Sequence, residues 1–182
     1  MDQVQGTAAA KPPPPPTFAA VYGSQATFVW RSMRRLGVPE ADVEDAAQEV
    51  FVVIHRKLPE FAGRSALKTW VFGICLRVAS DWRKRAHVKR ETDLDEAPER
   101  TTSGETAMNA IARKQARAKL DQALETLDED KRAVFVLFEL EQVPMADVAE
   151  AVGCPLQTAY ARLYAARKAI EAWIAANGEV RS

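Results

Sequence analysis

The sequence predicts an all-α protein made of two small helical units. Apolar residues recur at intervals of three and four along most of the chain, as on the buried face of a helix, and no segment alternates with the period of a strand. With 47% hydrophobic and 27% charged residues in 182, the composition is that of a globular protein. A charged segment without periodicity, residues 89–106, is the expected flexible linker between units at 18–88 and 107–177.

The N-terminal unit is expected to contain three helices. Apolar spacing predicts the first over residues 18–36, and Gly37 and Pro39 end it. The second opens with acidic side chains at residues 40–45, which suit the positive end of a helix dipole, and continues to Leu58. A loop at residues 59–65 precedes the third, which ends in the basic run 83–85. Its expected buried side carries Leu67, Trp70, Val71, Ile74, Val78 and Trp82.

The C-terminal unit is expected to end in a helix-turn-helix. Helical patterning resumes near residue 105, and the apolar run 133–138 predicts a buried helix. Two further helices, at 145–152 and 156–175, flank Gly153, which tolerates the positive φ of a tight turn. An ordinary helical hairpin with a solvated basic face is the alternative. The side of the last helix expected to face a DNA groove carries Gln157, Tyr164 and Lys168, with Thr158, Tyr160, Arg162 and Arg167 on its flanks.

Zero net charge hides a strong segregation of charge along the chain. Residues 61–90 contain eight Lys or Arg against one acid, and residues 91–106 contain six acids against one Arg. Basic clusters of this size are typical of nucleic-acid binding, although a solvated helix face gives the same pattern. The chain ends are expected to be tails, at 1–17, where the run Pro12–Pro16 favours extended polyproline II, and at 178–182.

Enzymatic, metal-binding and membrane functions find little support in the sequence. His55 and His87 have no catalytic partner at motif spacing, and no glycine-rich phosphate loop is present. Cys75 and Cys154 lie far apart, which excludes a zinc motif or a disulfide framework. We therefore expect no metal and no cofactor. No apolar stretch is long enough to cross a bilayer and no secretory signal is evident, so a cytoplasmic protein is expected, without membrane insertion.

Two segments resemble one family of bacterial proteins. Residues 42–85, DVEDAAQEVFVVIHRKLPEFAGRSALKTWVFGICLRVASDWRKR, are similar to region 2 of the extracytoplasmic-function (ECF, group IV) sigma factors of the sigma-70 family. Residues 120–170, from LDQALETL to YAARKAI, resemble region 4 of the same class. Together the two matches cover about three-quarters of the chain, in the family's order and spacing. The resemblance implies an RNA polymerase sigma factor with a region 2 bundle and a region 4 helix-turn-helix.

The resemblance to region 2 implies contacts with RNA polymerase and with the −10 element. The family pattern D-x-x-Q-E-x-F is present, and its polar residues Asp45, Gln48 and Glu49 would bind the clamp helices of the β′ subunit. The loop at 61–65 would capture an unstacked base, but Arg77 stands where the family often has Asn, which leaves the −10 sequence open. Trp70 suits a core role as well as a DNA role. The expected −10 contacts are Phe61, Arg64, Lys68, Thr69, Trp70, Arg77, Arg83, Lys84 and Arg85.

The resemblance to region 4 implies that the last helix reads the −35 element and that the domain contacts the β flap. Ala161 and Ala165 replace a Ser and an Arg of the usual family pattern, so fewer polar groups face the groove and the −35 sequence cannot be transferred. The expected −35 contacts are Gln157, Thr158, Tyr160, Arg162, Tyr164, Arg167 and Lys168.

The function expected from these segments is promoter-specific initiation of transcription, with melted-strand stabilisation, by a subunit of RNA polymerase that is not itself an enzyme. An anti-sigma factor is a natural further partner, and packing of the two DNA-binding faces against each other is a second route to control. A stand-alone helix-turn-helix regulator is the alternative, although it would not need the region 2 segment. A third possibility is a helical decoy that occupies polymerase without binding DNA.

Overall fold

The computed structural model describes residues 16–92 and 107–177, and within these ranges it contains helices and turns but no strand. This confirms the predicted all-α class. The predicted tails, apart from residues 16 and 17, and most of the predicted linker lie outside the described residues. The α-helices are α1 (Phe18–Arg35), α2 (Val43–Lys57), α3 (Leu67–Thr92), α4 (Ala107–Glu125), α5 (Glu129–Phe135), α6 (Met145–Val152) and α7 (Leu156–Asn177).

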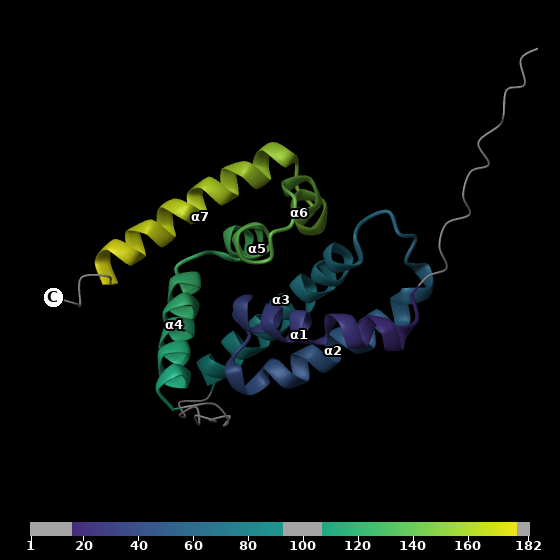
Figure 1. The fold of residues 1–182 in the computed structure, drawn as a ribbon, viewed down its shortest axis with the longest axis horizontal. Helices are drawn as coiled ribbons and strands as arrows, with labels where there is room; N and C mark the ends of the chain where they lie inside the picture. Colours follow the sequence, from purple (N-terminus) through teal and green to yellow (C-terminus); the bar gives the residue numbers. More distant parts are fainter. Residues whose placement is uncertain (1–15, 93–106, 178–182) are drawn as a thin grey trace, which may run out of the picture.

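Helices α1, α2 and α3 pack together as the N-terminal unit (Figure 1). The hydroxyl of Thr17 accepts a hydrogen bond from the N–H of Ala20 and caps the start of α1. Gly37 ends this helix with a φ of 85°, a conformation that favours glycine. A 3₁₀ turn at Glu40–Asp42 leads into α2, and a second at Leu58–Glu60 leads out of it.

Helices α4 to α7 form the C-terminal unit (Figure 1). Asp128 caps α5 by accepting the N–H of Lys131, and α5 runs into a π-helical turn at Val136–Leu140. Helices α6 and α7 meet at Gly153, whose φ of 66° is the left-handed turn that the sequence predicts. Buried Ala159, Leu163 and Ala166 lie on the side of α7 opposite the one expected to face a DNA groove.

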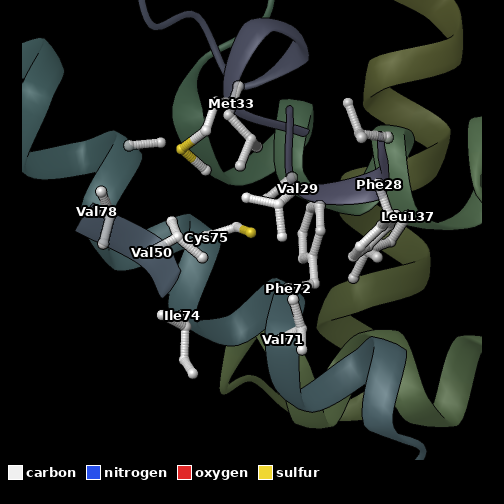
Figure 2. Close-up of a cluster of buried hydrophobic side chains, with 14 of the residues drawn as sticks. Phe28, Val29, Met33, Val50, Val71, Phe72, Ile74, Cys75, Val78 and Leu137 are labelled. Carbon is white, nitrogen blue, oxygen red and sulfur yellow. The ribbon is translucent and has the colours of Figure 1, made fainter. Parts of the chain in front are cut away.

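The two units share one hydrophobic core. Figure 2 shows Leu137, from the π-helical turn, beside Phe28 of α1 and Phe72 of α3. The rings of Phe28 and Phe72 lie 6.1 Å apart, and both side chains are at least 95% buried, with exposures of 5% and 0%. Helix α6 packs on α3, where the backbone oxygen of Ala151 lies near Gly73. The predicted units are therefore docked on each other.

Helix α3 is buried on more sides than its sequence pattern indicates. The expected stripe explains the burial of Val71, Ile74 and Val78, and Cys75 at its border is completely buried too. Phe72 lies about 100° around the helix from Val71, yet it is also completely buried. The reason is that α3 contacts α1 and α2 and also α6, so it lies in the middle of the fold instead of at the edge of one bundle.

We predict that Phe72→Ala lowers the free energy of unfolding by about 3–5 kcal/mol, because it leaves a cavity where both units meet. Urea denaturation followed by circular dichroism measures the change. Val52→Ala is the control, since Val52 is 51% exposed and its truncation should cost well under 1 kcal/mol. Equal losses in the two variants would contradict the shared core.

Candidate polymerase- and DNA-binding surfaces

The outer face of α2 carries the three residues expected to bind polymerase, in two different settings. Asp45 and Gln48 are exposed. Glu49 is half-buried and accepts a hydrogen bond of 2.8 Å from Nε1 of Trp82, with Arg85 3.3 Å away. Glu49 thus ties α2 to α3, a role that the sequence analysis missed.

An exposed apolar residue extends this face of α2. Val52 lies four residues after Gln48 and seven after Asp45, on the same side of the helix, and is 51% exposed. Sequence reasoning assigned it no role. Phe51, the aromatic end of the D-x-x-Q-E-x-F pattern, is only 8% exposed and packs against Tyr22, with ring centres 4.6 Å apart.

The loop before α3 presents one aromatic pair and one cation. The rings of Phe61 and Trp70 lie 5.0 Å apart, and both side chains are half-buried against the core. Arg64 is exposed. Trp70 therefore packs, as its helical phase indicates, and keeps part of its ring accessible beside the loop.

Helix α6 lies over the part of α3 expected to read the −10 element. Thr69 is 2% exposed, and it lines a cavity between the two helices with Arg77, Glu150 and Ala151. Arg77, itself exposed, and Lys84 also line a second hollow opposite Glu129 of α5. Acidic residues of the C-terminal unit therefore face the basic side of α3.

Two of the three residues at the basic end of α3, Arg83 and Arg85, also make contacts within the protein. Arg83 lies 2.6 Å from the carboxylate of Glu129 and donates a hydrogen bond of 2.7 Å to the backbone oxygen of Leu36. Arg85 stacks over Trp82, whereas Lys84 is exposed. Of these three expected −10 contacts, Arg83 is thus the one that pairs with the C-terminal unit.

The two arginines of α7 expected to contact DNA are paired with acids, whereas its two tyrosines are exposed. Arg162 pairs with Asp130, and Arg167 pairs with Glu139 at 2.6 Å, so both guanidinium groups are held against their own unit. Tyr160 and Tyr164 project outward, with exposures of 50% and 74%. Among the other expected −35 contacts, Gln157 and Lys168 are exposed and Thr158 is half-buried.

Glu141 forms the centre of an ion cluster between the units. Its side chain is 3% exposed, and its carboxylate accepts two hydrogen bonds from Arg31, at 2.8 and 3.0 Å. Arg35 lies 2.6 Å away and Lys68 2.9 Å away. The sequence predicted Lys68 as a DNA contact but assigned no role to Arg31, Arg35 or Glu141. Nothing in the local sequence pattern distinguishes Glu141 from other acidic residues at helix ends.

The local backbone aims Glu141 at the N-terminal unit. The π-helical turn ends when the N–H of Glu141 bonds to the oxygen of Val136, and Gln142 then takes a left-handed φ of 55°. The side-chain amide of Gln142 donates to the backbone oxygen of Glu139 at 2.7 Å, which stabilises this turn.

Two opposing effects act on the pKa of Glu141. Burial raises it, while hydrogen bonds from Arg31 and Lys68 and the positive charges of both lower it, and the net result is a pKa below the ordinary value for glutamate. The carboxylate is therefore ionised at neutral pH. Burial also raises the pKa of the Cys75 thiol, which lies completely inside the core.

Comparisons with known proteins agree with this geometry. The family described as Sigma-70 region 2 matches residues 21–88, and Sigma-70 region 4 matches residues 117–170. The ECF RNA polymerase sigma-E factor of Escherichia coli K12 is 30% identical over 142 residues, which are 74% of each chain. The chain belongs to the ECF class of the sigma-70 family. Another relative of this sigma factor, the RNA polymerase sigma-H factor of Pseudomonas aeruginosa, is 31% identical over 139 residues, or 71% of this chain and 72% of that protein.

Two solved structures share the fold of this sigma factor. CnrH, solved in complex with the cytosolic domain of CnrY, has a TM-score of 0.66 at 21% identity and covers 87% of this chain and 88% of its own. RpoE of Bartonella quintana, solved with the anti-sigma factor NepR, has a TM-score of 0.65 at 21% identity and covers 90% and 98%. Within residues 16–92 and 107–177, no helix is long and apolar enough to span a membrane.

We predict that Glu141→Gln destabilises the protein by about 1–3 kcal/mol at neutral pH, because the three cations lose their charged acceptor. Since the pKa of Glu141 is lowered in the fold, its contribution is complete above the unfolded pKa of about 4.3 and is lost as the pH falls through the folded value. The difference from the parent chain should therefore shrink below about pH 4. Thermal unfolding between pH 3 and 8 measures it, and a constant difference would contradict the assignment.

Proposed function

We propose that this chain binds core RNA polymerase and directs promoter-specific initiation by recognising the −35 and −10 elements and stabilising the melted strand. The observation that carries the proposal is the presence, in one chain, of an exposed polar face on α2 and an exposed helix-turn-helix face on α7. A stand-alone regulator needs only the second of these surfaces. The polymerase performs the chemistry.

Each surface has a distinct task in the proposal. Asp45 and Gln48 contact the β′ clamp helices, with Val52 as an apolar neighbour, and the C-terminal domain rests on the β flap. Helix α7 enters the major groove of the −35 duplex, where its outward tyrosines contact base edges and backbone. The aromatic pair Phe61 and Trp70 offers a stacking surface to an unpaired base of the −10 strand.

The proposal includes a protein inhibitor and a place of action. One structural neighbour was solved in complex with an anti-sigma factor. Both relatives are named as RNA polymerase sigma factors. We therefore infer that a protein of this kind regulates the chain, and that the chain acts in the cytoplasm, where the polymerase is.

We predict chain-dependent run-off transcripts when the purified chain is added to core polymerase on a promoter library. Aligned active promoters should share one −35 and −10 pair. Failure to bind core polymerase would refute the proposal and favour a stand-alone helix-turn-helix regulator, whereas binding without initiation would favour a decoy.

We expect the double variant Asp45→Ala, Gln48→Ala to bind core polymerase at least about tenfold more weakly, because two polar contacts are removed from a solvent-exposed surface. Fluorescence anisotropy with labelled chain measures this affinity. Glu171→Ala, an exposed acid of α7, is the matched control and should bind normally. If the double variant also binds normally, the polymerase surface lies elsewhere.

We expect Tyr164→Ala to lower transcription from −35-dependent promoters about tenfold, which corresponds to the loss of one good groove contact. Affinity for core polymerase should not change. The control is Ile174→Ala, because Ile174 is an apolar residue of the same helix that is 54% exposed but lies outside the expected DNA face. Equal transcription by both variants would remove Tyr164 from the −35 surface.

A further inference from the structure

We propose that Arg31, Arg35 and Lys68 form a binding site for a backbone phosphate of single-stranded nucleic acid, and that Glu141 occupies this site while the two domains are packed together. The ligand class rests on the proposed function, but the site itself rests on geometry. Neither Arg31 nor Arg35 belongs to the DNA contacts that the sequence predicts.

The three cations already hold an anion. Oε1 of Glu141 is contacted by Arg31 at 2.8 Å and by Arg35 at 2.6 Å. Oε2 is contacted by Arg31 at 3.0 Å and by Lys68 at 2.9 Å. A phosphodiester has the same recognition chemistry, namely one negative charge shared by two free oxygens, and the arginine fork fits both groups. The cluster is therefore a phosphate site with a carboxylate in it.

The acids that neutralise this part of the N-terminal domain come mainly from the C-terminal domain. Arg34 pairs with Asp121 at 2.6 Å, and Arg83 pairs with Glu129. On its own side of the interface, Arg34 also pairs with Glu40, at 3.3 Å. Separation of the domains would remove three carboxylates and leave the cations facing solvent.

The placement of the cations favours a nucleic-acid strand over a small anion. Lys68 follows the base-capturing loop 61–65 by three residues, and its Nζ lies 5.0 Å from the ring centre of Phe28. Arg83 lies fifteen residues further along α3, or about 22 Å at the rise of an α-helix. Cations spread over such a length suit several phosphates of one strand.

The consequence is a competition within the chain. Glu141 and a strand phosphate cannot occupy the same three cations at once, so domain packing and strand binding exclude each other. Polymerase, by holding the domains apart, would expose the site at the moment when the melted strand becomes available.

The test measures binding of a fluorescein-labelled 15-nucleotide single strand to the full chain without polymerase. Glu141→Gln keeps the size of the side chain but removes its charge. We expect it to bind the strand at least about tenfold more tightly than the parent chain, because the competing carboxylate is gone, and with a steeper loss of affinity as salt rises. Glu171→Gln, also an acid-to-amide change in the C-terminal domain, should leave the affinity unchanged.

Removing the site should cancel this gain. In the triple variant Glu141→Gln, Arg31→Ala, Arg35→Ala the affinity should return to the parental value, and retention of the gain would overturn the proposal, as would an unchanged affinity in Glu141→Gln. Asp121→Asn removes a second carboxylate from the interface between the units and should raise strand affinity by a smaller factor. This variant provides the test if Glu141→Gln fails to fold.

Two further measurements distinguish a nucleic-acid strand from a small anion, and this inference from the proposed function. Inorganic phosphate at millimolar concentration should compete weakly, and complete displacement of the strand would replace the nucleic-acid assignment by a small-anion site. The strand-binding test contains no polymerase and is therefore independent of run-off transcription. If Glu141→Gln binds the strand more tightly but the chain fails to initiate transcription, the proposed function is refuted and this inference is not. If the chain initiates transcription normally but Glu141→Gln shows no gain in strand affinity, this inference is refuted and the proposed function is not.

Discussion

The packing of the C-terminal domain onto α3 is the constraint on which the rest of the structure depends. It places Phe72 in a core shared by both units and brings Glu141 to three cations of the N-terminal unit. It also covers Thr69 and engages Lys68 and Arg83, which are expected to meet DNA. We call this arrangement the closed form, because the side of α3 expected to meet the −10 strand is turned toward the C-terminal unit.

Apolar and ionic contacts contribute differently to the stability and the geometry of this interface. Burial of Phe28, Phe72 and Leu137 removes apolar surface from water and supplies the favourable free energy. The ion cluster around Glu141 contributes less net stability, because four charged groups lose hydration when they meet. Its geometry instead fixes one orientation of the domains. In the inference drawn above, an anionic competitor replaces Glu141 in this part of the interface.

The surfaces expected to bind polymerase and duplex DNA are not covered by this packing. Asp45, Gln48 and Val52 remain exposed in the closed form, as do Tyr160 and Tyr164. A closed chain could thus present its α2 face to a partner before its −10 surface is free.

The sequence by itself determined the helices, the helix-turn-helix and the family, because helical periodicity, capping and turn residues are local properties. It also placed Gln157, Tyr160 and Tyr164 on the exposed side of α7. Only the tertiary structure decided that Glu49 ties α2 to α3 and that Glu141 binds Arg31, 110 residues away. Such pairings depend on how two apolar faces dock, and no periodicity within either segment contains that information.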